Sequence, residues 1–139
     1  IRVFVTHLGL RPAERRYQVR RMLELIAEVP ADQAVVVLGD INEWLPVGRP
    51  LRWMHALLGQ APAERSFPAR LPVFALDRVW VRPYWALLAF GTHRTAGARI
   101  ASDHLPVKAI IAAKAGTEQG GSVHRPNRRR QPRNNDRSE

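Results

Sequence analysis

The 139-residue sequence contains no cysteine. This absence excludes disulfide bonds, thiolate zinc sites and cysteine nucleophiles, while it leaves the redox environment open. Long hydrophobic runs are missing as well: stretches such as Trp85–Phe90 fall far short of the roughly 18 residues that a membrane span needs. No secretory signal is visible at the start, although the first residue is Ile1 rather than Met. We expect a soluble protein with a preference for the cytoplasm and leave its compartment and oligomeric state open.

Acidic residues are scarce relative to basic ones. The chain has 22 Lys and Arg against 12 Asp and Glu, a net charge of +10. The excess is uneven, because residues 114–139 contain seven basic and three acidic side chains. Such a balance favours polyanionic partners, namely nucleic acid, phosphorylated substrates or an anionic membrane surface. It is equally compatible with an Arg-rich protein that has no anionic partner.

Hydrophobic periodicity predicts one α/β domain with a mixed sheet over residues 1–113. In chain order we expect a strand over residues 1–8, a helix over Pro12–Val29, a strand over Ala34–Leu38, a helix over Leu51–Leu58, a loop over residues 60–72, and strands over Phe74–Val81, Tyr84–Phe90 and Leu105–Ala112. From Lys114 onward apolar residues almost vanish, so residues 114–139 are predicted to form a disordered basic tail. The start in mid-strand, at Ile1, suggests that an N-terminal part is missing.

Four short polar segments lie at the ends of apolar runs: Thr6–Leu8, Gly39–Asn42, Leu76–Arg78 and Ser102–His104. Taken singly, each has an ordinary explanation as a chance tripeptide, a turn, a surface ion pair or a cap. Taken together, they share a setting at strand ends, where a rigid scaffold presents catalytic groups to a cleft. The set therefore favours one functional site.

The side chains of these segments suit phosphodiester hydrolysis. The candidate site residues are His7, Asp40, Asn42, Asp77, Asp103 and His104. This reaction needs a cation that neutralises developing charge, a group that deprotonates water, and stabilisation of the leaving oxygen. Carboxylates are ligands that Mg²⁺ prefers, imidazoles serve as base, acid or phosphate donor, and the carboxamide can donate to a phosphoryl oxygen or to the attacking water.

With these motifs the sequence resembles the endonuclease/exonuclease/phosphatase superfamily, the fold shared by deoxyribonuclease I, abasic-site endonucleases, inositol-polyphosphate phosphatases and bacterial sphingomyelinases. The resemblance covers about residues 2–112, and its specific anchors are Gly39–Asn42 and Ser102–Val107. It implies part of a four-layer α/β sandwich with mixed β-sheets, of which this sequence would hold the C-terminal half.

The resemblance also implies a role for each matched residue. His104 would be the base, or the group that contacts the scissile phosphate, and Asp77 would orient it. Asp40 and Asn42 would align the water and stabilise the transition state. His7 would bond a phosphate oxygen or act as an acid.

The cofactor implied by the resemblance is Mg²⁺, with Mn²⁺ as an alternative, and Asp103 would coordinate it. The superfamily supplies a further metal-binding Glu from strands upstream of the Thr-His-Leu segment, and nothing in Ile1–Thr6 replaces it. Glu43 matches no ligand of the family and is interpreted as a loop residue. Arg78 is expected to help bind an anionic substrate.

We therefore expect a divalent-metal-dependent phosphoester hydrolase acting on nucleic acid, a phospholipid headgroup or a small phosphate ester. One alternative is a catalytically incomplete fragment that lacks the upstream Glu and exposes a sheet edge and an apolar face. Another is a nucleic-acid-binding protein that acts through residues 114–139, with a strong dependence on salt.

Overall fold

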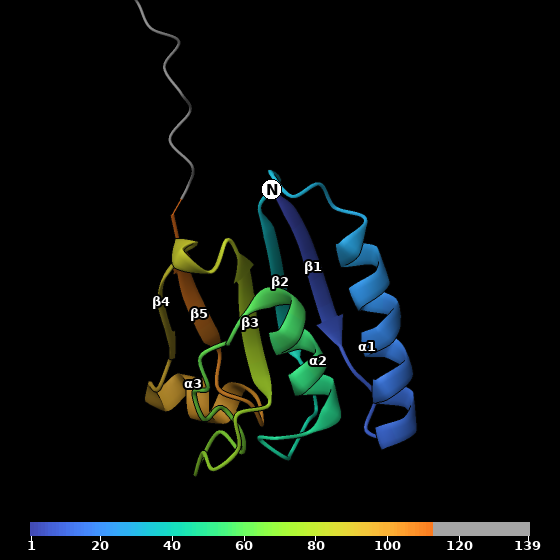
Figure 1. Ribbon diagram of the computed structural model, residues 1–139. Coiled ribbons are helices and arrows are strands. Elements are labelled where there is room, and N and C mark those ends of the chain that lie inside the picture. Colours follow the sequence, from blue (N-terminus) through green and yellow to red (C-terminus); the bar gives the residue numbers. More distant parts are fainter. Residues whose placement is uncertain (113–139) are drawn as a thin grey trace, which may run out of the picture.

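The computed structural model describes residues 1–112, and a three-stranded sheet lies at its centre (Figure 1). Its strands are β1 (Arg2–His7), β2 (Val35–Asp40) and β3 (Asp77–Arg82), in the order β1–β2–β3. Strand β2 is parallel to β1 and antiparallel to β3. The sheet is therefore mixed, as the sequence predicts.

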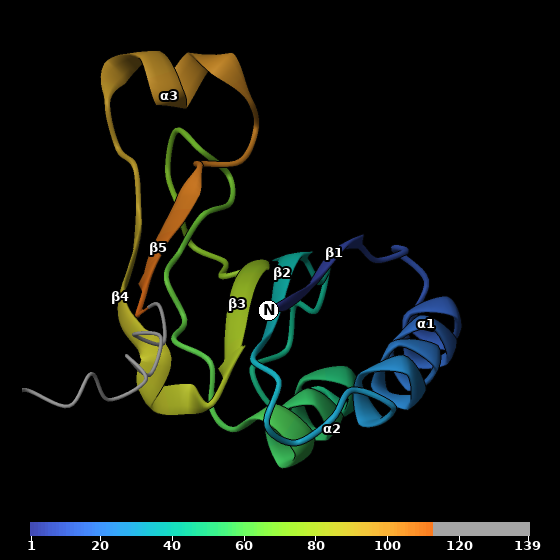
Figure 2. The same ribbon diagram turned by 90° about the horizontal axis from the view of Figure 1, so that it is seen from above.

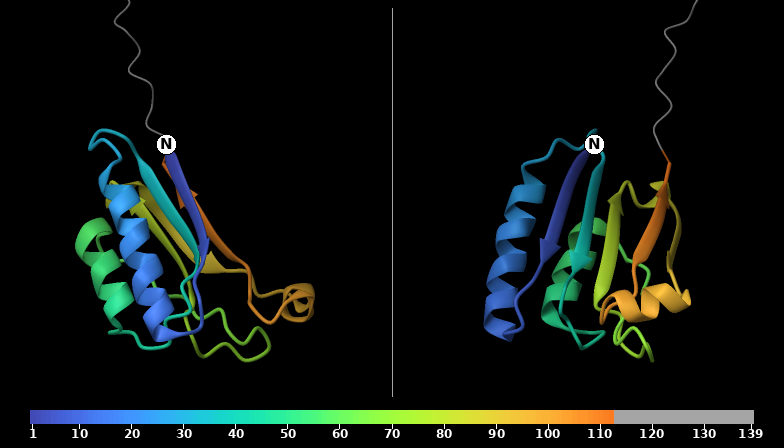
Figure 3. Two further views of the ribbon diagram at one scale, coloured as in Figure 1. Left: turned by 90° about the vertical axis from the view of Figure 1, so that its right-hand side faces the viewer. Right: turned by 180° about the vertical axis from the view of Figure 1, so that it is seen from behind.

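Two helices cover one face of this sheet (Figure 3). Helix α1 (Pro12–Ala27) joins the parallel strands β1 and β2, which need a crossover connection because no tight turn can link them. Helix α2 (Arg49–Leu58) follows β2. Each helix has a proline in its first two positions, where the missing N–H removes no helical hydrogen bond. The predicted end of the first helix at Val29 is two residues too late, because Glu28 already caps it.

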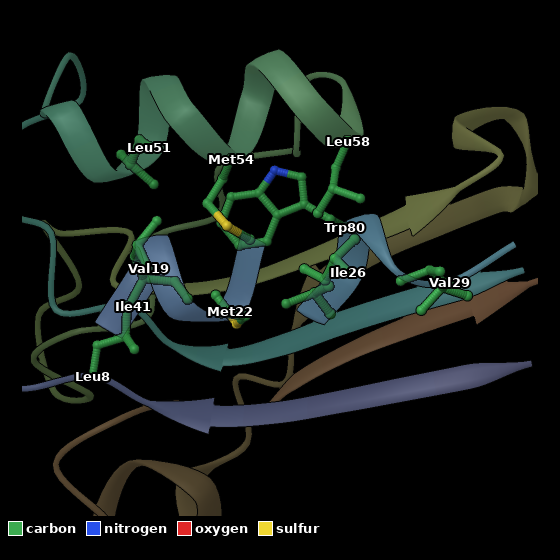
Figure 4. Packing of buried hydrophobic residues seen from close by; sticks show 12 residues of the cluster. Leu8, Val19, Met22, Ile26, Val29, Ile41, Leu51, Met54, Leu58 and Trp80 are labelled. Carbon is green, nitrogen blue, oxygen red and sulfur yellow. The ribbon is translucent and has the colours of Figure 1, made fainter. Parts of the chain in front are cut away.

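The main core lies between the two helices and the sheet (Figure 4). Its buried members are Leu8, Val19, Met22, Ile26, Val29, Val35, Val37, Ile41, Leu51, Met54, Leu58 and Trp80. Val35 and Val37 point to this side of β2 because side chains alternate along a strand. The first residues after β1 and β2, Leu8 and Ile41, also belong to this core. Both loops that leave the sheet are therefore anchored at their first residue.

The opposite face of β2 and β3 packs on a two-stranded antiparallel sheet of β4 (Leu87–Thr92) and β5 (Val107–Ile111). The buried residues of this second core are Val36, Val79, Val81 and Ala86. Figure 2 shows β4 and β5 beside β3, on the side away from α1. Because side chains alternate along β2 and β3, one face of these strands packs on the helices and the other face packs on β4 and β5.

The three predicted strand starts in the second half are wrong. The strand expected from Phe74 begins only at Asp77, since Phe74 forms an isolated bridge with Phe67. The strand expected from Tyr84 begins at Leu87, because residues Tyr84–Ala86 form a 3₁₀ turn. The last strand begins at Val107 rather than Leu105. In each case apolar residues of the preceding loop extend the strand pattern ahead of the true start of the strand.

A third helix, α3 (Ala96–Ala101), was not predicted. It has only six residues, too few for an apolar stripe to show in the sequence, and its signal is the Thr95 hydroxyl, which accepts a hydrogen bond from the Ala98 amide. The helix lies at the same end of the molecule as the loops after β1 and β2 (Figure 1).

Within residues 1–112, β4 and β5 leave the β1 part of the sheet face that they pack on exposed to solvent. Val3 and Val5 of β1 lie on this side and are 54% and 76% exposed. Residues 1–112 thus have an exposed apolar strip of the kind that the fragment alternative expects, and that alternative stays a prediction. None of the helices in this part of the chain has both the length and the apolar character to cross a membrane. The predicted basic tail, residues 114–139, lies outside the described residues.

Candidate active site

Three of the predicted site residues form one row across the end of the central sheet. The strand register pairs His7 of β1 with Asp40 of β2, and Asp40 with Asp77 of β3. Because β1 and β2 end where the antiparallel β3 begins, the three residues occupy the same edge. The prediction that polar side chains gather at strand ends is confirmed for this row.

The fourth polar segment reaches the row through two backbone hydrogen bonds. The Leu105 amide donates to the Ser66 carbonyl at 2.8 Å, and the Ala69 amide donates to the Asp103 carbonyl at 2.6 Å. These bonds tie the segment after α3 to the loop before β3. They bring His104 beside Asp77, although the two residues are far apart in the sequence.

His104 and Asp77 form a hydrogen-bonded pair. The distance from His104 Nδ1 to Asp77 Oδ2 is 2.8 Å, and since a carboxylate only accepts, Nδ1 carries the proton. The buried Ser66 hydroxyl donates to the same carboxylate oxygen. The Phe67 ring packs on the imidazole with 4.8 Å between ring centroids. This contact between Asp77 and His104 is the one that the orienting role expected for Asp77 requires.

The surroundings of His104 raise its pKa above the ordinary value. Burial by itself lowers the pKa of the imidazole, but the hydrogen bond to Asp77 and the negative charges of Asp77, Asp40 and Asp103 outweigh that effect. The protonated imidazolium is therefore favoured at this position more than in a free histidine.

Asp40 lies between the two imidazoles. Its Oδ2 atom is 3.6 Å from His7 Nε2 and 3.7 Å from His104 Nε2. Its other oxygen, Oδ1, accepts a hydrogen bond of 2.9 Å from the Asn42 amide, as in a short Asx-type turn. The Asp40 carboxylate is thus held from one side and faces both histidines with the other.

The glycine before Asp40 is required by the backbone. Gly39 has φ 142°, and a Cβ atom there would lie 1.8 Å from the Thr6 carbonyl oxygen of the neighbouring strand. No other residue fits this close approach. Gly39 is therefore needed where β2 passes close to β1, one residue before Asp40.

Asn42 has a left-handed backbone with φ 50°, a conformation that Asn tolerates better than most residues. Its side chain is buried and donates from Nδ2 to the Leu8 carbonyl at 2.8 Å. One amide hydrogen is therefore engaged with the loop after β1. The second hydrogen and the carbonyl oxygen remain for the role that the sequence predicts.

These residues surround a cavity of about 480 Å³. Its walls are formed by His7, Leu10, Asp40, Asn42, Trp44, Phe67, Leu76, Asp77, Ser102, Asp103 and His104. All six predicted site residues are among them. Asp103 is exposed, and its carboxylate lies 3.3 Å from the Ser102 hydroxyl, which leaves oxygens accessible to a ligand.

Sequence reasoning missed Ser66 and the aromatic wall of the cavity. Trp44 contacts Phe67 edge to face, with ring centroids 5.6 Å apart, and both line the cavity. Ser66 and Phe67 come from a stretch interpreted only as loop. Nothing local marks them, because their roles depend on contacts with Asp77 and His104.

The expectation for Arg78 is wrong. Arg78 is buried on the helix side of β3 and donates to the Pro62 carbonyl at 3.3 Å, and it does not line the cavity. Side chains alternate along β3, so Asp77 and Arg78 face opposite ways. Burial lowers the pKa of Arg78, and burial together with the Arg78 charge lowers the pKa of the neighbouring His55.

No group of three or more acidic or histidine side chains within residues 1–112 is arranged to hold a metal ion. Asp103 offers hard oxygen donors at the cavity, as Mg²⁺ prefers. Mg²⁺ is commonly held by one or two carboxylates, substrate phosphate and water, so this donor chemistry fits a partial site.

The structure thus has a layered α/β fold with a row of aspartates and histidines across one end of the central sheet. The chain belongs to the Endonuclease/Exonuclease/phosphatase family, whose sequence pattern matches residues 2–104. The resemblance drawn from the motifs is thereby confirmed.

The relatives agree with this assignment. The chain is 32% identical over 117 residues to the uncharacterized protein YbhP of Escherichia coli K12. This match covers 80% of the chain and 46% of YbhP. The YbhP of Shigella flexneri matches to the same extent. A solved structure of a functionally unknown conserved protein from Enterococcus faecalis V583 has a TM-score of 0.64 at 16% identity, over 81% of this chain and 50% of that one. The chain thus has part of the family fold and spans about half the length of these relatives.

Proposed function

We propose that the cavity hydrolyses a phosphodiester with the help of a divalent cation. The observation that carries this proposal is the chain of contacts Asp77–His104–Asp40, in which a carboxylate orients an imidazole that faces a second carboxylate. Oriented imidazoles paired with carboxylates are the usual acid–base groups of hydrolytic sites.

Each side chain has a role that its contacts support. With Nδ1 held by Asp77 and its pKa raised, His104 presents Nε2–H to a phosphate oxygen and stabilises the charge that develops on it. Asp40, with Oδ1 held by the Asn42 amide, accepts a proton from the attacking water through Oδ2. Asn42 donates its remaining amide hydrogen to the water or the phosphate. The exposed His7 binds a phosphate oxygen or protonates the leaving group.

Asp103 is the proposed ligand for Mg²⁺ or Mn²⁺. When bound, such an ion neutralises charge on the phosphate and its leaving oxygen. We propose that a further acidic ligand comes from outside residues 1–112, because this part of the chain holds no complete metal site.

The test is hydrolysis of bis(4-nitrophenyl) phosphate by the full-length natural protein that carries this chain. EDTA should abolish the activity and Mg²⁺ or Mn²⁺ should restore it. Asp40→Ala should lower turnover by about two orders of magnitude or more, the scale for one acid–base or electrostatic group. Asp32→Ala is the matched control, because Asp32 is an exposed aspartate that does not line the cavity.

Two outcomes would contradict the proposal: activity that survives EDTA, or wild-type turnover in Asp40→Ala. A panel of duplex DNA, abasic DNA, sphingomyelin and inositol phosphates then separates the three substrate classes. Residues 1–139 tested alone address the fragment hypothesis, which expects hydrolysis by the full-length protein and none by this piece.

A further inference from the structure

A buried ion pair contacts the two loops that form part of the cavity wall. Arg15 of α1 and Glu43, the residue after Asn42, are 5% and 8% exposed. Arg15 Nη2 and Glu43 Oε2 are 3.6 Å apart. Neither side chain lines the cavity. Two charges are costly to bury, and a pair of well-packed apolar residues is often at least as stable. The pair therefore calls for an explanation other than stability.

Arg15 also holds the loop that follows β1. Its Nη1 atom donates to the carbonyls of Gly9 and Leu10, at 3.3 Å for Gly9. Gly9 and Leu10 come two and three residues after His7, and Leu10 is part of the cavity wall. A single guanidinium thus fixes the path of the chain just beyond His7.

Glu43 holds the loop that follows β2. Its Oε1 atom accepts a hydrogen bond of 3.1 Å from the Leu45 amide. The carboxylate fills the space beside Gly48, where a Cβ atom would lie 2.3 Å from Glu43 Cδ. The loop between Glu43 and Gly48 includes Trp44, another part of the cavity wall.

Asn42 makes a second bridge between the same two loops, through its hydrogen bond to the Leu8 carbonyl. Two consecutive residues, Asn42 and Glu43, therefore join the loop after β2 to the loop after β1. Asn42 does so from the cavity wall, and Glu43, which does not line the cavity, does so through Arg15.

We propose that Arg15 and Glu43 are positioning residues that hold the His7 loop and the Asn42 loop in the relative placement that catalysis needs. The catalytic part of this inference rests on the proposed function. Small displacements of catalytic groups cost up to about a hundredfold in rate, so a clamp between two loops that each carry such a group affects turnover.

The first variant is Glu43→Gln, which keeps an acceptor for the Leu45 amide and removes the charge that faces Arg15. The second is Gly48→Ala, which leaves both charges in place and pushes the carboxylate out of its space. Gly97→Ala is the matched control, because a Cβ atom there meets nothing within 4 Å. We expect kcat for a phosphodiester to fall about tenfold in both test variants, with KM changed less, and to stay unchanged in the control.

Amide hydrogen exchange supplies a readout that needs no activity. Exchange should accelerate in both residues 8–11 and residues 43–48 of Glu43→Gln and Gly48→Ala. Faster exchange in both loops supports the clamp even if the wild-type protein hydrolyses no phosphodiester, a result that contradicts the proposed function alone. Exchange that changes in one loop only, or in neither, overturns the clamp.

The double variant Arg15→Met/Glu43→Leu separates positioning from stability. Replacing both charges by apolar side chains should leave the thermal midpoint close to that of the wild type while kcat is low, because the contacts of Arg15 with the Gly9 and Leu10 carbonyls are lost. Wild-type values of both quantities would show that the pair acts on stability only. If this double variant does not fold, Gly48→Ala still decides the question.

Discussion

The two sides of the cavity are built very differently. On one side, the His104 side chain is 23% exposed, bonded to Asp77 and covered by Phe67. On the other, the His7 side chain is 77% exposed, and its polar contact within residues 1–112 is with Asp40 at 3.6 Å. Both histidines face the same carboxylate, so the difference lies in what surrounds them.

This contrast divides the chemistry. An imidazole fixed by a carboxylate and an aromatic ring is preorganised, and it loses little freedom when a phosphate binds. An exposed imidazole at a strand end must be ordered by the substrate itself. We therefore propose that His104 contacts the phosphate from a fixed orientation and that His7 contacts it only once the substrate has ordered its side chain, and the predictions below test this division.

The largest expected effect separates the two histidines directly. His104→Ala should lower kcat for a phosphodiester by about a hundredfold or more, because it removes an oriented donor that stabilises charge on the phosphate. His7→Ala should lower kcat/KM by roughly tenfold, in keeping with a contact that substrate has to order. Steady-state kinetics of both variants in the full-length natural protein measure the ratio. Equal losses would contradict the division between a fixed and an open side.

Much of this arrangement could be predicted from sequence. The apolar run that ends at Gly39–Asp40 and the strand that ends at Thr6–His7 placed two site residues at strand ends, and the register then aligned them with Asp77. Periodicity was sufficient because a strand fixes where its last residue points.

What failed depends on tertiary contacts. Ser66 and Phe67 gain their roles by meeting Asp77 and His104 across the chain. The Arg78 side chain was expected to contact substrate because the sequence alone does not show which face of β3 it lies on. Glu43, interpreted as a loop residue, is explained only by Arg15, 28 positions away in another element. No local pattern encodes such pairings.

A smaller effect tests what holds the fixed side. Ser66→Ala removes the hydroxyl that donates to Asp77 and leaves the carboxylate oxygen to His104 alone. A lost hydrogen bond to a charged group costs about 1.5–3 kcal/mol of stability. We expect that loss in denaturant unfolding and a fall of kcat by a few fold, since Asp77 becomes less well oriented. An unchanged kcat would mean that the hydrogen bond with His104 by itself suffices to orient the carboxylate.

The smallest effect is a dependence of stability on pH, measured on the metal-free protein in EDTA. Because the folded state raises the pKa of His104, it binds the proton more tightly than the unfolded chain, whose value is near 6.5. The resulting stabilisation is complete below pH 6.5 and is lost as the pH rises through the raised pKa of the folded state.

The variant Asp77→Asn removes a charge that helps to raise the pKa of His104. The thermal midpoint of this variant should therefore decline less between pH 6 and pH 9 than that of the wild type. His55, whose lowered pKa acts in the opposite direction at lower pH, is common to both proteins and cancels in the comparison. Identical pH profiles would mean that Asp77 orients His104 without changing its proton affinity.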